Sequence, residues 1–154
     1  MLLSPKETAR AMLGTLPFVT RVVRAEMRSH RALGLSVPQF RALAFIRRYP
    51  GASLSAAAEH LGVTLPTMSR LIDGLVKRKL MLRQSNSGDR RRIILELTPR
   101  GRALWQTAYD FTQASMTKKL SALNGSQCAT VVNAMRILHQ LFAPGSAGSG
   151  RGDS

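Results

Sequence analysis

Acidic residues, cysteine and aromatic residues are all scarce in this chain, and each shortage narrows the possible structures. Only 8 of its 154 residues are Asp or Glu, and they are scattered, so the carboxylate pairs that many hydrolases use are missing. The single cysteine, Cys128, excludes a disulfide within the chain and suits a reducing compartment. Because aromatic residues make up only 5% of the sequence, Leu, Ala, Val, Ile and Met must build most of the core.

Long apolar runs are missing as well. No stretch approaches the roughly 20 apolar residues that a membrane-spanning helix needs. The first ten residues include Pro5, Glu7 and Arg10, which interrupt the apolar run that a signal peptide requires. We therefore expect a soluble, cytoplasmic protein that has no membrane partner.

Catalytic and metal-binding motifs are also absent from the sequence. It contains neither a Gly-rich phosphate loop nor a nucleophile elbow. His30, His60 and His139 have no metal-ligand spacing with one another or with Cys128. We expect neither an enzyme nor a bound metal or other cofactor, and we interpret Cys128 as structural or incidental rather than as a redox sensor.

Positive charge is what the chain has in excess. Its 23 Lys and Arg residues give a formal net charge of +15. A folded domain gains nothing from so much self-repulsion, so a polyanionic partner is the natural explanation. Nucleic acid is the first candidate and an anionic membrane surface the second. The alternative interpretation is a basic, solvated surface without any partner.

The spacing of apolar and capping residues predicts a mainly helical chain with one small β-hairpin. Three segments have the form of a helix-capping box: Ser4-Pro5-Lys6-Glu7, Ser36-Val37-Pro38-Gln39 and Asn124-Gly125-Ser126-Gln127. Gly14 and Pro17 predict a break or kink in the first helix. Residues 81–85 and 93–97 read as two short strands around a turn-rich loop. The low-complexity residues 143–154 are expected to be a disordered tail.

Residues 53–61 and 64–79 read as two helices joined by a tight turn, directly before the hairpin. In a helix-turn-helix the second helix enters the major groove of DNA, with its N-terminal residues nearest the bases. Its polar side carries the candidate major-groove residues Thr64, Pro66, Thr67, Ser69 and Arg70. Small hydroxyls allow close approach, and Arg70 can donate two parallel hydrogen bonds to guanine or bind a phosphate. The alternative is an ordinary amphipathic helix with a polar face.

The hairpin adds a cluster of basic residues. Seven basic side chains lie between residues 77 and 92, with one acid, Asp89, among them: Lys77, Arg78, Lys79, Arg83, Arg90, Arg91 and Arg92. Consecutive arginines at a protruding tip repel one another, and a narrow, negative minor groove would offset this because it attracts inserted Arg. Asp89 can hold one guanidinium in a fixed orientation. The alternative is a solvated, charged turn.

Taken together, these motifs resemble the MarR family of winged helix-turn-helix regulators. The resemblance rests on segments in the correct order and spacing: Leu61-Gly62-Val63, Pro66-Thr67-Met68-Ser69-Arg70-Leu71-Ile72-Asp73, Asp89-Arg90-Arg91-Arg92 and Leu97-Thr98-Pro99-Arg100-Gly101. The Asp-x-Arg wing that leads into Leu-Thr and a helix is its most specific part. It covers about residues 16 to 142.

The resemblance implies a role for each of these segments. Residues 64–79 would be the recognition helix, and Arg91 would enter the minor groove, oriented by Asp89 and flanked by Arg90 and Arg92. Phosphate contacts are expected from further basic residues: Lys77, Arg78 and Arg83. Many members of the family have an effector pocket between the dimerisation helices and the winged domain, and its candidate lining here is Met27, His30, Phe40 and Trp105. For Trp105, core or dimer packing is the favoured alternative.

The resemblance also implies a homodimer, in which the first helix and the last two helices interlock. The apolar stripes at both chain ends agree with this, because a small winged domain cannot easily cover them. We therefore predict a dimerisation helix in 1–34, kinked near 14–17, a winged helix-turn-helix in 35–98 and dimerisation helices in 99–142. A two-fold dimer would read a pseudo-palindromic operator.

The predicted function is a sequence-specific transcriptional regulator that binds double-stranded DNA and, as in most members of the family, represses transcription. Either a small-molecule effector releases it from DNA or it acts constitutively. One alternative is a non-specific architectural or nucleoid protein, which the charge of +15 also suits. Another is a module that uses the winged fold to bind protein. The sequence discloses neither the effector nor the operator.

Overall fold

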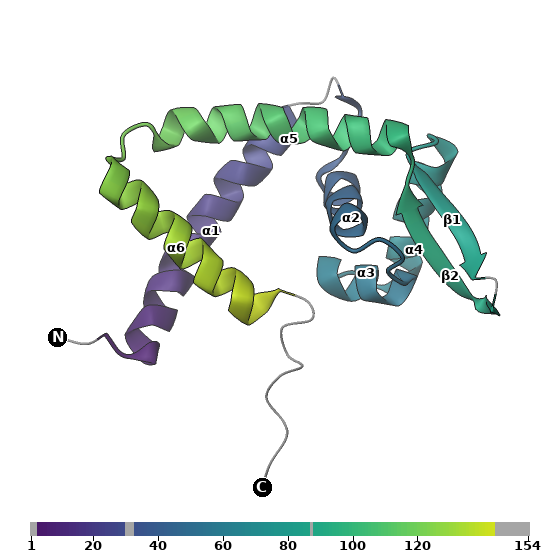
Figure 1. The fold of residues 1–154 in the computed structure, drawn as a ribbon, viewed down its shortest axis with the longest axis horizontal. Coiled ribbons are helices and arrows are strands. Elements are labelled where there is room, and N and C mark those ends of the chain that lie inside the picture. Colours follow the sequence, from purple (N-terminus) through teal and green to yellow (C-terminus); the bar gives the residue numbers. More distant parts are fainter. Residues whose placement is uncertain (1–2, 30–32, 87, 144–154) are drawn as a thin grey trace, which may run out of the picture. The chain divides into compact units, whose positions relative to one another are not determined.

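A computed structural model describes residues 3–29, 33–86 and 88–143, and for residues 86 and 89–92 it describes the backbone alone. The chain is mainly helical with a single antiparallel hairpin, which confirms the predicted fold class (Figure 1). Eight elements follow one another: α1 (Pro5–Ser29), α2 (Val37–Arg48), α3 (Leu54–Leu61), α4 (Leu65–Lys77), β1 (Met81–Asn86), β2 (Asp89–Leu97), α5 (Pro99–Leu120) and α6 (Gly125–Phe142). The chain forms two compact units, which divide between Met116 and Thr117.

Helix α1 begins at the predicted capping box. The Glu7 amide donates to Ser4 Oγ at 3.2 Å, and the Ser4 amide donates to Glu7 Oε2 at 2.8 Å. The Ser4 amide and the Ser4 hydroxyl both donate to Glu7 Oε2, and these two hydrogen bonds lower the pKa of the Glu7 carboxyl. Of the predicted break or kink at Gly14 and Pro17, the break is wrong, because α1 continues through both residues, and the kink stays a prediction. Proline removes one intrahelical hydrogen bond and leaves those of the other turns intact, which a helix of 25 residues tolerates.

The next three helices are bounded by the capping residues that the sequence indicated. Ser36 and Gln39 form the predicted reciprocal box at the start of α2, and Ser53 caps α3. Gly62 ends α3 in the left-handed conformation, with φ at +69°. Thr64 then caps α4, which ends at Lys77, two residues earlier than predicted, because the chain turns at Lys79 with φ at +57°.

The hairpin is longer than the apolar pattern predicts. Strands β1 and β2 pair antiparallel from Met81 with Leu97 to Ser85 with Ile93, and the register shifts after Ser85. Strand β2 begins at Asp89 instead of Ile93. The charged residues at its start pair through their backbone. The alternation of apolar residues therefore could not predict that they belong to the strand.

The core lies where α2, α3 and α4 meet the base of the hairpin and the start of α5. Its largest fully buried side chains are Leu43, Ile46, Met68, Ile72, Leu75, Leu80, Met81 and Leu95. Helix α5 is fixed closely to this core, since a Cβ on Gly101 would lie 1.9 Å from the carbonyl oxygen of Leu80. Thr98 Oγ1 also donates to the carbonyl of Lys79 at 2.7 Å and accepts from the Gly101 amide at 2.9 Å. The end of α4 and the start of α5 are therefore joined rigidly.

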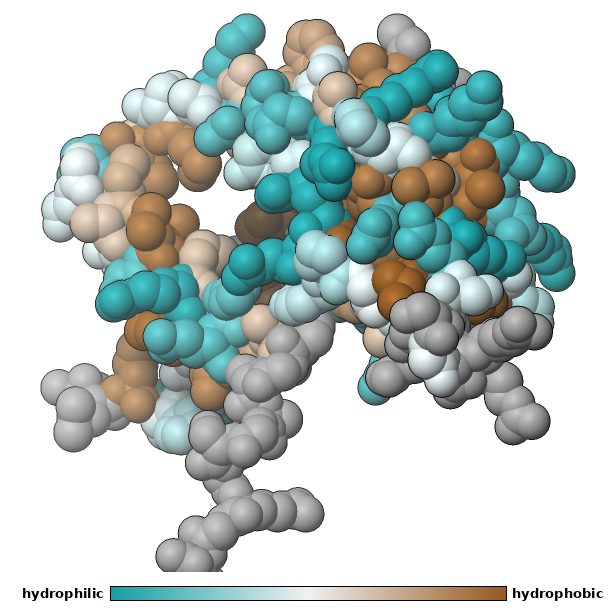
Figure 2. Space-filling view, turned by 45° about the vertical axis from the view of Figure 1, so that its right-hand side comes forward, coloured by the Kyte–Doolittle hydropathy of each residue, from teal (hydrophilic) through white to brown (hydrophobic). Residues whose placement is uncertain are grey.

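Helices α1 and α6 differ from the others because none of their residues is buried. Large apolar side chains remain exposed on both, among them Leu13 at 77% on α1 and Val132 at 68% on α6. Figure 2 shows hydrophobic side chains at the surface among the polar ones. Exposed apolar surface of this extent indicates that these helices take part in an interface.

Candidate nucleic-acid interface

The first two turns of α4 form a polar, solvent-facing surface. Thr64 Oγ1 accepts a hydrogen bond from the Thr67 amide at 3.3 Å and donates to Thr67 Oγ1 at 2.9 Å. Thr64, Pro66, Thr67 and Arg70 are all exposed. The opposite side of the helix is buried in the core through Met68, Ile72 and Leu75. The packing of α4 thus leaves four of the five predicted major-groove residues free to meet a ligand.

Leu65, which sequence reasoning missed, belongs to the same surface. It is the first residue of α4 and is 50% exposed. An apolar side chain on a helix that enters the major groove can contact the methyl group of thymine. The signal in the sequence was its position directly after the capping Thr64, at the open end of the helix where little can cover it.

The fifth predicted residue, Ser69, has a partner inside the protein. Its Oγ accepts from Arg83 Nη2 at 3.3 Å, and Asp73 Oδ1 accepts from Arg83 Nη1 at 2.9 Å. Arg83 lies on β1, so these contacts join the hairpin to α4. Arg83 Nε is buried and has no hydrogen-bond partner among the described residues. The contact of Asp73 with Arg83 was not predicted from the sequence.

Arg78 also has partners inside the protein. It caps the C-terminus of α4, and its Nη1 donates to the carbonyl of Gly34 at 2.5 Å and its Nη2 to that of Leu33 at 3.4 Å. Gly34 has φ at +66°, and a Cβ there would lie 3.1 Å from Arg78 Nη2. Of the predicted phosphate contacts Lys77, Arg78 and Arg83, Lys77 alone is exposed without an internal partner in the part of the chain that the structure describes.

The tip of the hairpin is described through its backbone. Asp89, Arg90, Arg91 and Arg92 belong to strand β2. Their side chains lie outside the described residues, so the pairing of Asp89 with Arg91 stays a prediction.

Two of the predicted effector-pocket residues, Phe40 and Trp105, lie side by side with stacked rings whose centroids are 6.2 Å apart. Met27 and Phe40 line a small cavity of about 10 Å³, whose other walls are Leu33, Leu35, Ala108 and Thr112. A space of this size holds no more than a water molecule. Trp105 does not line this cavity and lies in the core, where it also stacks on Tyr109 with ring centroids 4.9 Å apart and is covered by the Arg47 guanidinium at 3.8 Å. His30 lies outside the described residues.

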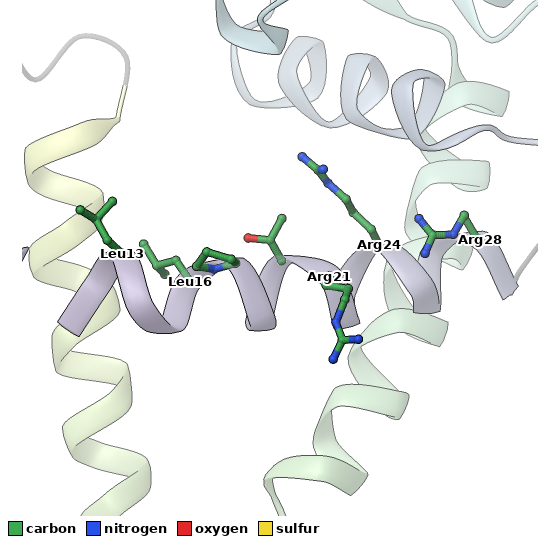
Figure 3. A pocket seen from close by; sticks show the side chains of 7 residues that line it. Leu13, Leu16, Arg21, Arg24 and Arg28 are labelled. Carbon is green, nitrogen blue, oxygen red and sulfur yellow. The ribbon is translucent and has the colours of Figure 1, made fainter. Parts of the chain in front are cut away.

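A larger, open groove of about 510 Å³ runs along α1 (Figure 3). Its lining combines an apolar end with three arginines: Leu13, Leu16, Pro17, Thr20, Arg21, Arg24 and Arg28. Sequence reasoning treated α1 for its apolar stripe alone and missed the arginines, although their spacing of three and four residues was visible. A groove with this lining can bind an anionic group through its arginines and an apolar group through its leucines.

The remaining candidates carry no site in the described part of the chain. No group of three His, Cys, Asp or Glu residues there is arranged to hold a metal ion. The described helices include none with the length and apolar character that crossing a bilayer takes.

His60 stacks on Phe45 with ring centroids 4.5 Å apart. Partial burial, helped by the nearby Arg41 charge, lowers the pKa of its imidazole. Cys128 is an exposed free thiol on α6.

Comparisons with known proteins agree with this geometry. The model of the MarR family matches residues 33–92. The chain is 31% identical over 119 residues to the HTH-type transcriptional repressor Rv2887 of Mycobacterium tuberculosis, which covers 76% of this chain and 86% of the relative. The identity to the crystal structure of wild-type MarR from E. coli is 19%, with a TM-score of 0.69 over 90% of this chain and 98% of that one. The transcriptional repressor CouR, bound to a 23-mer DNA duplex, is 25% identical, with a TM-score of 0.66 over 90% and 98%.

Proposed function

Because the chain belongs to the MarR family of winged helix-turn-helix transcriptional regulators, we propose that it represses transcription as a homodimer bound to a pseudo-palindromic operator. The observation that carries this proposal is the exposed face of Thr64, Thr67 and Arg70 on α4, beside a hairpin whose tip sequence contains three arginines. Members of this family are regulators and not enzymes. We place its action in the cytoplasm, where bacterial DNA lies.

In this proposal α4 enters the major groove. Thr64 and Thr67 lie at its N-terminus, where short side chains allow the backbone to approach the DNA and the helix dipole favours a phosphate. Arg70, one turn further along, reaches a guanine edge through two parallel hydrogen bonds, and Leu65 contacts a thymine methyl. Lys77 binds a phosphate and supplies affinity without reading sequence.

The hairpin reads the neighbouring minor groove. Arg91 is the residue that enters it, held by Asp89, while Arg90 and Arg92 bind the flanking phosphates. A narrow minor groove has a strongly negative potential, and an inserted guanidinium is attracted to it. The position of these residues at the tip of a two-stranded hairpin supports the assignment.

The dimer is formed by α1, α5 and α6. Support comes from the apolar side chains that α1 and α6 leave exposed, for example Leu13 and Val132, which a second copy can cover. Two copies related by a two-fold axis place two recognition helices in successive major grooves, with half-site centres about 34–36 Å apart. The operator is then an inverted repeat.

Release by a small-molecule effector is the least supported part of the proposal. The cavity beside Met27 and Phe40 is too small to hold an effector unless it opens. The α1 groove with Arg21, Arg24 and Arg28 has the charge to attract an organic anion. A screen of aromatic and aliphatic carboxylates by thermal shift, with release of bound DNA as the second readout, tests whether an effector acts.

The experiment that tests the proposed function uses the purified protein and tiled duplex fragments of the DNA upstream of its own gene. Fluorescence anisotropy identifies fragments that stay bound at about 150 mM salt against a shuffled duplex, and footprinting then locates the protected bases. An inverted repeat under the footprint supports the proposal. Equal binding to all fragments supports the architectural alternative, which the charge of +15 favours.

A further inference from the structure

Arg83 on β1 has a structural role that could not be inferred from its charge alone. We propose that Arg83 is a positioning residue, which fixes the hairpin to the recognition helix through Asp73 and Ser69, and that it makes no phosphate contact. The proposal rests on the proposed function, because it concerns how two DNA-reading elements are held together.

The register of the hairpin directs Arg83 inward. Arg83 pairs with Leu95, and residues that face each other across an antiparallel pair point to the same side of the sheet. Leu95 is fully buried, as is Met81 on the same side of β1, whereas Leu82 on the other side is 43% exposed. Arg83 therefore points toward α4, as the burial of its Nε confirms. It occupies a position that an apolar residue would normally take.

The guanidinium joins two successive turns of α4. Nη1 donates to Asp73 Oδ1 at 2.9 Å, and Nη2 donates to Ser69 Oγ at 3.3 Å. Because Ser69 and Asp73 are four residues apart, they lie one above the other on the same face of the helix. A planar fork that binds both at once fixes how far β1 sits along α4 and how it is rotated around it. A single contact would fix neither.

The charge balance also argues against a phosphate contact. The Arg83–Asp73 pair is the one ion pair found among the described residues, and the Arg83 side chain is only 29% exposed. In a chain with 8 acidic residues, one of them is used to neutralise this arginine within the DNA-binding unit. That placement reduces attraction to phosphate, so a positional role explains it better. Lys77, four residues after Asp73, is exposed and has no such partner.

The first test needs no DNA. Hydrogen exchange is followed in the hairpin amides of the wild type, Arg83→Gln, Arg83→Lys and Asp73→Asn, with Lys77→Gln as a control that removes one charge from the exposed side of α4. We expect the hairpin amides to exchange faster in Arg83→Gln, Arg83→Lys and Asp73→Asn than in the wild type. In Lys77→Gln they should exchange at the wild-type rate. Arg83→Lys is informative because it keeps the charge and loses the fork. Wild-type hairpin exchange in Arg83→Gln would overturn the proposal.

The second test measures salt dependence on a random-sequence duplex of about 30 base pairs. A residue that neutralises one phosphate contributes about one to the slope of log K against log salt. Lys77→Gln should therefore lower the slope by about one, while Arg83→Gln and Arg83→Lys, which both lose the fork that holds the hairpin, should have the same slope. A slope about one lower in Arg83→Gln than in Arg83→Lys would show a phosphate contact and overturn the proposal. Neither test needs an operator, so both decide the role of Arg83 even if specific DNA binding is not found.

The third test uses the fragment that the wild type prefers. Arg83→Gln and Asp73→Asn should each weaken its binding by roughly tenfold, as coupled residues of a network do, and the double variant should bind about as weakly as either single one. Independent losses that multiply to roughly a hundredfold would contradict a shared role. Lys118→Gln, an exposed residue near the end of α5, is the control for the loss of one positive charge.

Discussion

At the scale of single residues, the structure separates basic side chains that are free to bind DNA from those that hold the protein together. Lys77 and Arg70 are exposed, whereas Arg78 donates to the carbonyls of Gly34 and Leu33, and Arg83 binds Asp73. The sequence placed Lys77, Arg78 and Arg83 in one basic cluster and Arg70 among the candidate major-groove residues. Charge alone could not divide them, since the partners of Arg78 lie 44 and 45 residues away along the chain.

Arg91 is the residue whose removal should most affect DNA recognition. We predict that Arg91→Ala weakens binding to the preferred fragment by roughly 1–3 kcal/mol, because an arginine inserted into the minor groove is lost. Anisotropy titrations of wild type and variant measure the change, with circular dichroism as the check on folding. Unchanged affinity in a folded variant would show that the hairpin tip does not read DNA.

Gly101 tests how closely α5 is joined to the core. Gly101→Ala should destabilise the fold by at least about 2 kcal/mol, because its Cβ would overlap the Leu80 carbonyl oxygen. Gly14→Ala is the matched control, since nothing lies within 4 Å of its Cβ position inside α1, and it should stabilise by roughly 0.5–1 kcal/mol. Thermal unfolding compares the two. Equal stability of both variants would refute the close contact.

At the scale of elements, the helix starts could be predicted because capping is local. Ser36 and Asn124 form reciprocal boxes with a Gln three residues later, and these signals need no knowledge of the fold. The continuity of α1 through Pro17 and the early start of β2 at Asp89 could not be predicted. Both depend on backbone hydrogen bonds that override the local preference of proline or of charged residues.

Arg78 holds the C-terminal end of α4, and Arg83 holds the side of α4 that faces the hairpin. Gly34 is important because its carbonyl accepts the hydrogen bond from Arg78. Gly34→Ala forces an alanine into the left-handed region and brings its Cβ to 3.1 Å from Arg78 Nη2. Gly62→Ala meets the same backbone strain with no atom within 4 Å, so it should cost about 1 kcal/mol, and Gly34→Ala should cost more. Chemical denaturation measures both, and a smaller loss for Gly34→Ala would contradict the importance of the Arg78 contact.

At the scale of the whole molecule, exposed apolar surface and net charge define what the protein needs from its partners. Val132 on α6 is 68% exposed, and we predict that Val132→Asp shifts the protein from dimer to monomer, because the charge would be buried in the interface. Analytical ultracentrifugation measures the shift, with Glu59→Gln, an exposed residue on α3 outside the proposed interface, as the control. A variant that stays dimeric at the same concentration as the wild type would exclude α6 from the interface.

The central claim is sequence-specific binding, and the specificity ratio tests it most directly. The affinity of the wild type for its preferred upstream fragment is measured at about 150 mM salt beside that for the same bases in shuffled order. The account predicts a preference of about 10³-fold or more, as specific regulators have. Equal affinities that fall together as salt rises would contradict it, and would show that the charge of +15 alone holds the protein on DNA.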